Sequence, residues 1–151
     1  MKNITIALYF LLHLFYIQIY SYAQCIKGNC KNGYGTYIYA NKGKYIGHWK
    51  NQKRHGKGLF IYTDSSILEV IWKHDSPHGY GTFKSYYGII YKGYWKGAFV
   101  YGKGEILYPD GKKYKGFLHK GKRHGFGKLF NANGILLKKG IWKNDTFIRE
   151  K

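Results

Sequence analysis

Few residues in this sequence have the types and spacing that catalysis requires. Among 151 residues there are only seven Asp and Glu. The acids outside predicted turns are Glu69, Glu105 and Glu150, which lie far apart along the chain. A paired-carboxylate site needs two acids within several Å of each other, and this spacing indicates no such pair. The Ser residues lie in no nucleophile motif. The sequence therefore predicts a protein that is not an enzyme and has no small-molecule substrate.

A column of histidines is the one set of residues that suggests metal binding. His55, His78 and His124 occupy equivalent positions of a repeat. Neighbouring strand pairs would hold them about 10 Å apart, which is too far for them to share one ion. We therefore expect each histidine to cap or hydrogen-bond its own turn. The Gly-x-Gly sequences precede no predicted helix and so form no phosphate loop. We predict neither a metal nor a cofactor.

The two cysteines, Cys25 and Cys30, predict a disulfide. Gly28 and Asn29 between them favour a tight turn, which would bring the two side chains together. An even number of cysteines in an exported chain is typical of such a bridge. A metal site or a redox pair is the alternative, although two cysteines do not supply the four ligands of a usual metal site. Lipid modification of Cys25 is disfavoured because Gln24 precedes it.

The N-terminal residues are typical of an export signal. Ile4–Tyr20 is almost wholly apolar, and the small residues Ser21 and Ala23 match a signal-peptidase site. We predict a signal helix over residues 1–23. The alternative is an uncleaved anchor, since the apolar run reaches the lower limit of a membrane span. Either way the protein is expected to be periplasmic, secreted or on the outer surface.

The remainder of the chain follows a period of 23 residues. Trp49, Trp72 and Trp95 are separated by this interval, the next step reaches Leu118, and Trp142 arrives one residue late. Five Gly-x-Gly pairs keep the same period and begin at Gly33, Gly56, Gly79, Gly102 and Gly125. A fixed period in this range indicates an array of stacked units.

Each unit has the pattern of a β-hairpin. Tyr45–Trp49 and Gly56–Tyr62 alternate as strands do, and turn-forming residues lie between and after them. The fold prediction is therefore an all-β, elongated, single-layer antiparallel sheet of stacked hairpins. The expected units lie near residues 24–43, 44–66, 67–89, 90–112 and 113–136, with a partial unit at 137–151.

Glycine and aromatic residues together form the predicted repeat core. An aromatic ring can lie flat over a neighbouring strand only where the backbone has no Cβ, so we expect both glycines of each pair to share the aromatic face. The predicted core residues are Tyr45, Gly47, Trp49, Gly56, Gly58, Phe60, Trp72, Gly79, Gly81, Tyr91, Gly93, Trp95, Gly102, Gly104, Tyr114, Gly116, Gly125, Gly127 and Trp142.

This pattern resembles the MORN repeat family (membrane occupation and recognition nexus). The copies that carry the resemblance read Tyr45-Ile-Gly47-His-Trp49 with His55-Gly56-Lys-Gly58-Leu-Phe60, Tyr91-Lys-Gly93-Tyr-Trp95 with Gly102-Lys-Gly104, and Tyr114-Lys-Gly116-Phe-Leu118 with His124-Gly125-Phe-Gly127. The copy at Leu68-Glu-Val70-Ile-Trp72 lacks the first Tyr and Gly. The resemblance implies a scaffold or lipid-associated adaptor, and it implies that some such arrays self-associate.

Positive charge is the remaining functional indication. The formal charge is +19, falling to +18 without residues 1–23, which contain Lys2 and no acid. Most of the excess lies in the second half, where alternation places lysines among aromatic rings on the face away from the core. The candidate anion-binding residues on that face are Lys92, Lys96, Lys103, Lys113, Lys115 and Lys128, and a second group, Lys120, Lys122 and Arg123, lies at a predicted hairpin turn. A solvated face in a lysine-rich protein is the alternative.

The expected function is binding or scaffolding. Basic residues mixed with aromatic ones suit a protein partner, an anionic membrane or an envelope polymer. The alternative is binding of nucleic acid or another polyanion, which export disfavours. An open sheet also leaves two edges to cover, so a homodimer is expected to be feasible.

Overall fold

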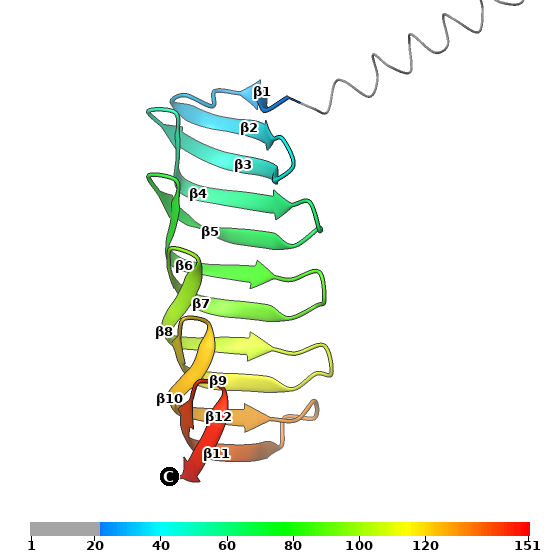
Figure 1. Cartoon of the computed structure of the whole chain (residues 1–151), viewed down its shortest axis with the longest axis vertical. Coiled ribbons are helices and arrows are strands. Elements are labelled where there is room, and N and C mark those ends of the chain that lie inside the picture. Colours follow the sequence, from blue (N-terminus) through cyan, green and yellow to red (C-terminus); the bar gives the residue numbers. More distant parts are fainter. Residues whose placement is uncertain (1–21) are drawn as a thin grey trace, which may run out of the picture.

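The strands form a single open sheet in which every strand pairs with its neighbours in the chain. The structure is a computed structural model that describes residues 22–151. The sheet has twelve antiparallel strands in sequence order, and Figure 1 shows them stacked along the long axis. Their bounds are β1 Gln24–Gly28, β2 Gly33–Tyr39, β3 Gly43–Lys50, β4 Lys53–Tyr62, β5 Ile67–Lys73, β6 Ser76–Lys84, β7 Ile90–Lys96, β8 Phe99–Leu107, β9 Lys113–His119, β10 Lys122–Phe130, β11 Leu136–Lys143 and β12 Thr146–Glu150.

This arrangement confirms the predicted all-β sheet of hairpins. Residues 22–151 contain no helix, and they therefore contain no helical segment capable of crossing a membrane. The predicted signal helix lies outside the described residues.

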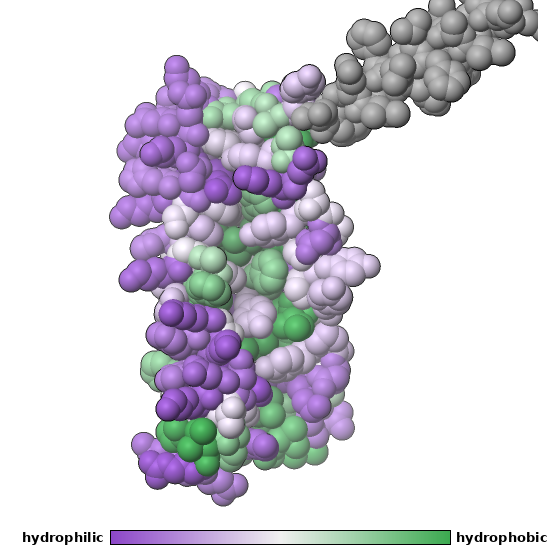
Figure 2. All heavy atoms as spheres, in the orientation of Figure 1, coloured by the Kyte–Doolittle hydropathy of each residue, from purple (hydrophilic) through white to green (hydrophobic). Residues whose placement is uncertain are grey.

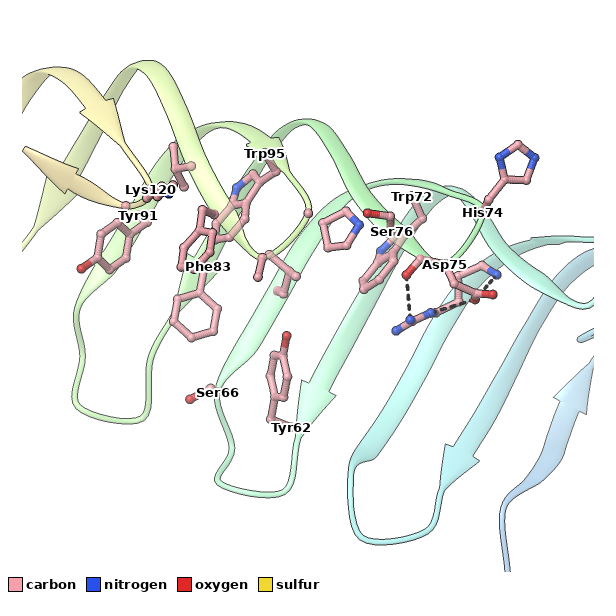
Figure 3. A pocket seen from close by; sticks show the side chains of 18 of the residues that line it. Tyr62, Ser66, Trp72, His74, Asp75, Ser76, Phe83, Tyr91, Trp95 and Lys120 are labelled. Atoms are coloured by element: carbon pink, nitrogen blue, oxygen red, sulfur yellow. Dashed lines mark hydrogen bonds and ion pairs between the residues drawn. The ribbon is translucent and has the colours of Figure 1, made fainter. Parts of the chain in front are cut away.

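A bulge in each repeat hairpin bends the sheet. In β3–β4 the register shifts between Gly47 and Trp49, and in β5–β6 it shifts between Val70 and Trp72. By contrast, the β4–β5 and β6–β7 pairs, which join successive hairpins, keep a continuous register. Bulges increase strand bending and twist. The strands accordingly arch over one face of the sheet, as the ribbon in Figure 3 shows, and this face forms a trough.

The bulge also corrects one prediction about glycine. Gly56 and Gly79, the first glycines of their pairs, lie at the bulges with φ of 65° and 86°. A Cβ on Gly56 would meet His48, and one on Gly79 would meet Ile71, both on the face away from the aromatic core. The expectation that both glycines of a pair lie under aromatic rings is therefore wrong for the first glycine. That residue is required because L side chains rarely adopt its positive φ.

The second glycine lies under a ring in two of the pairs, at Gly58 and Gly127. A Cβ on Gly81 would instead meet Val70 and one on Gly104 would meet Leu118, so the expectation of an aromatic ring over the second glycine is wrong there. The Tyr45 ring covers Gly47 and Gly58, where a Cβ would overlap its hydroxyl and ring carbons. Its hydroxyl donates a hydrogen bond of 3.0 Å to the carbonyl of His48. Tyr114 repeats this arrangement over its own two glycines, and both tyrosines are fully buried.

Aromatic contacts join each hairpin to the next. The Tyr45 ring lies 5.1 Å from Trp49 in its own strand and 5.4 Å from Trp72 in the following hairpin, centroid to centroid and nearly perpendicular to both. The Trp72 indole N–H in turn donates to the carbonyl of Gly58 at 3.1 Å. The predicted tryptophans thus belong to one continuous core cluster rather than to separate surfaces.

The third hairpin shows how tyrosine and glycine depend on each other. Leu68 occupies the Tyr45 position and Val70 occupies the Gly47 position, and both are buried. A leucine side chain is shorter than a tyrosine ring and leaves room for the Val70 side chain. The departure from the motif at these two positions therefore keeps the core filled.

We expect Gly47→Val to lower the free energy of unfolding by about 2–3 kcal/mol, because the new side chain would overlap the Tyr45 ring. The double variant Tyr45→Leu/Gly47→Val, which copies the third hairpin, should recover part of that loss. Urea unfolding followed by tryptophan fluorescence measures both. A double variant less stable than Gly47→Val alone would contradict the coupling.

Candidate binding surfaces

The face away from the core, called here the outer face, carries aromatic side chains in a row. Cross-strand pairs place Tyr80 beside Tyr94 and Lys103 beside Phe117. Tyr80, Tyr94 and Phe117 are 65%, 45% and 44% exposed. Exposed aromatic rings aligned across adjacent strands are available for contact with a partner or an interface.

Lysines flank this row and form what is called here the basic stripe. Pairing places Lys92 opposite Thr82, Lys115 opposite Glu105, and Lys128 opposite Lys139. The stripe consists of Lys92, Lys96, Lys103, Lys113, Lys115, Lys128 and Lys139. Sequence reasoning missed Lys139, although Gly140, aligned with Gly116 after the one-residue insertion, could have indicated it.

Glu105 is the one acid paired across strands with a lysine of this stripe. Its carboxylate lies 3.0 Å from the Lys115 ammonium, in a partly exposed ion pair. Such a pair contributes little to stability, but it lowers the net positive charge of the stripe. The other stripe lysines make no ion pair with any described residue.

The three candidates at the β9–β10 turn do not join the basic stripe. Lys120 lines a groove on the trough face, and Lys122 begins β10 at the turn. Arg123 is already engaged, since its Nε lies 3.1 Å from the Asp145 carboxylate and its guanidinium lies 4.4 Å from the Trp142 ring centroid. Arg123 is therefore not a free anion-binding residue.

Arg54, in β4 nearer the N-terminal end of the array, makes the same kinds of contact as Arg123. Its Nε donates to the Asp75 carboxylate at 3.2 Å and its Nη2 to the Asp75 carbonyl at 2.8 Å. The guanidinium carbon lies 4.1 Å from the centroid of the Trp72 ring. We call each of these two arrangements an Arg–Asp plug, because the pair covers a tryptophan in the trough.

The histidine column does not behave as predicted. Nδ1 of His55 and of His124 is buried without a hydrogen-bond partner among the described residues. His78 bonds the hydroxyl of Tyr94 at 3.0 Å, in the next hairpin. The expectation that each histidine bonds its own turn is therefore wrong, because the bulge directs these rings across strands. No group of three potential metal ligands occurs within residues 22–151.

A groove of about 860 Å³ opens in the trough between the two plugs. Figure 3 shows Trp72, Phe83, Tyr91 and Trp95 along it, with Tyr62 and Ser66 on one side. The space-filling view in Figure 2 shows hydrophobic side chains in a column along the long axis, flanked by hydrophilic ones. Size and lining match those of ligand sites. Sequence reasoning missed this groove, since no single motif marks it.

Burial changes the acidity of the tyrosines that line or support the trough. It raises the pKa of Tyr114 to about 12, although the nearby Arg123 charge opposes the shift. Burial also raises the pKa of Tyr45, Tyr62 and Tyr91. These side chains are neutral at physiological pH and act through packing and hydrogen bonding.

Cys25 and Cys30 form a disulfide at the first edge of the sheet. The bridge closes the turn between β1 and β2, and β1 is exposed along its whole length. A short closed loop provides a modest stabilisation of about 2 kcal/mol, which supports an edge strand that buries little surface.

The protein is thus a repeat protein built on one sheet. One face of the sheet is basic, and the other forms an aromatic trough. The MORN repeat family model matches residues 27–44, 45–67, 71–86 and 114–135. The chain belongs to this family, which confirms the predicted resemblance. None of the curated proteins matches the sequence.

We expect the free energy of unfolding to fall as pH rises above about 10. Unfolded tyrosine ionises near pH 10, whereas Tyr114 in the fold keeps its proton to about pH 12. The stabilisation is complete below pH 10 and is lost as pH approaches 12. Urea unfolding between pH 9 and 12 measures this slope.

Tyr114→Phe should make that slope shallower, while at pH 7 it should cost only about 1 kcal/mol for the lost hydrogen bond to the Phe117 carbonyl. An unchanged slope in this variant would show that Tyr114 does not cause the alkaline loss.

Proposed function

We propose that this protein is an exported, non-enzymatic binding module whose outer face binds an anionic membrane or envelope surface. Membership of the MORN repeat family supports a binding role. The single observation that carries the proposal is the basic stripe, which places seven lysines beside exposed aromatic rings on one face.

The geometry of the stripe favours a surface over a single small anion. Adjacent strands lie about 4.8 Å apart, so lysines on several strands present separate charges along the long axis rather than converging on one point. Each lysine near an anionic membrane contributes about 1 kcal/mol. Aromatic rings between them suit the interfacial region, where one edge of a ring is apolar and the other is wet.

Nucleic acid is the second candidate, because the same lysines and rings suit phosphates and stacked bases. The signal-like residues 1–23 weigh against it. Fluorescence anisotropy with single-stranded DNA, run beside the vesicle experiment, distinguishes the two.

The test uses residues 24–151, which contain the whole buried core, with vesicles containing phosphatidylserine. We expect binding that weakens steeply between 0.05 and 0.5 M salt, as charged interfaces do. Changing Lys92, Lys96, Lys103 and Lys128 to Gln should weaken binding at least tenfold at about 0.1 M salt, since each lysine contributes about 1 kcal/mol.

The matched control changes Lys27, Lys31, Lys42 and Lys53 to Gln. These residues are exposed and lie outside the basic stripe, and their loss changes the net charge equally, so the control should bind nearly as the parent protein does. Equal losses in the two variants, or equal binding to neutral phosphatidylcholine vesicles, would overturn the proposal.

A further inference from the structure

The groove lies where two successive repeats lack the arginine of the Arg–Asp plug. At intervals of 23 residues after Arg54 come Pro77, Val100 and Arg123. The first and last of these four form Arg–Asp plugs, whereas Pro77 and Val100 form none. The groove lies beside these two central residues and is lined by both.

The partner acid is missing in the same two repeats. Asp75 occupies the turn of one hairpin and Asp145 the turn of the last. The corresponding turn of the fourth hairpin, between β7 and β8, contains Gly97 and Ala98, and both line the groove. The backbone connection survives, since the Gly97 N–H donates to the Pro77 carbonyl at 3.0 Å, much as the Asp75 N–H donates to the Arg54 carbonyl at 3.1 Å.

Three of the four aromatic walls that enclose the Arg54 guanidinium are nevertheless kept, and the fourth, Tyr45, is replaced by Leu68. Besides the Trp72 contact, the guanidinium carbon lies 5.4 Å from the Phe60 ring centroid and 5.7 Å from that of Tyr39. The residues 23 positions later are Trp95, Phe83 and Tyr62, and all three line the groove.

These walls form a cation-binding cup that lacks its guanidinium. Arginine over aromatic faces is a favourable arrangement, and the chain itself demonstrates it twice.

Charge in the groove matches a paired guest. Asp64 lines it near Tyr62 and makes no ion pair with a described residue. Lys120 also lines it and is likewise unpaired there. A guest that carried a cation alone would be repelled by the overall charge of +18. A guest with both charges would place its cation near Asp64 and its anion near Lys120.

We propose that the groove binds a segment of a partner protein that presents an arginine beside an acidic residue, and so supplies the Arg–Asp pair that this repeat lacks. The guest arginine stacks on the aromatic walls that Phe83 and Tyr62 provide. The guest carboxylate takes the place that Asp75 occupies in the neighbouring plug and lies toward Lys120. The site is on the trough face, so it is independent of the outer face and of its basic stripe.

The experiment titrates residues 24–151 with the peptide Ac-Gly-Arg-Asp-Gly-amide and follows the indole N–H signals by NMR. Trp95 lines the groove, and its Nε1 has no hydrogen-bond partner among the described residues. Its indole N–H signal is therefore expected to respond to a peptide bound in the groove. We expect saturable shifts centred on Trp95. Peptides with Lys or Leu in place of Arg should bind at least fivefold more weakly.

The decisive variant is Pro77→Arg/Ala98→Asp, which builds a plug into the third repeat without changing the net charge. It should weaken peptide binding at least tenfold and leave vesicle binding through the outer face unchanged. Asp64→Asn is a second variant that keeps the Oδ1 atom bonded to the Ser66 N–H, and it should weaken binding several-fold.

Three results would overturn the proposal. They are an absence of saturable shifts, equal affinity for the Leu peptide, and a folded plug variant that binds as the parent does. If the plug variant fails to unfold cooperatively, unchanged affinity in Asp64→Asn has the same meaning.

Discussion

The ring of Tyr45 rests on glycine backbone and touches a tryptophan in its own hairpin and another in the next. This contact does two things at once, because it fills the core of one unit and attaches that unit to its neighbour. A single hairpin offers no second tryptophan and would leave the ring half covered. The units of such an array therefore stabilise one another, as nearest-neighbour repeats do. The need for bare backbone under the ring explains the glycines at Gly58 and Gly127, whereas at Gly81 and Gly104 the space that a Cβ would fill is taken by Val70 and Leu118.

The bulge gives the two faces of the sheet different shapes. Alternation along the strands already places the aromatic residues on one side and the lysines on the other. With a bulge in each hairpin, the strands arch over the aromatic side, which becomes a trough, and the lysines remain on the opposite side. The two faces therefore differ in both shape and chemistry and point in opposite directions.

The fold could be predicted from the sequence because its determinants are local and periodic. Trp49, Trp72 and Trp95 give the period, and alternation around them gives the strands. The function of Gly56 could not be predicted, since a bulge shifts the alternation by a residue and periodicity alone cannot detect the shift. The Arg54–Asp75 pair also escaped prediction, because its members are separated by almost one repeat and meet only after the bend forms.

The groove was harder still to predict, since it is defined by small residues such as Pro77 and Ala98 where other repeats have charged ones. It can be recognised only by comparing repeats after the structure shows what the charged residues do. The lysines of the outer face could be predicted only in part. Alternation placed Lys92 and Lys128 correctly, but Arg123 was assigned to the same function because nothing local indicates that Trp142 and Asp145 engage it.

The direction of the hydrogen bonds in the array has a mechanical consequence. Only consecutive strands make extensive contacts within the described residues, and their backbone bonds run along the long axis of the stack. Tension applied between its two ends would pull parallel to these bonds. It would break them one strand pair at a time rather than loading many of them together in shear. The array should therefore extend under low force in steps of about one hairpin, and it would act as an elastic link between whatever holds its ends.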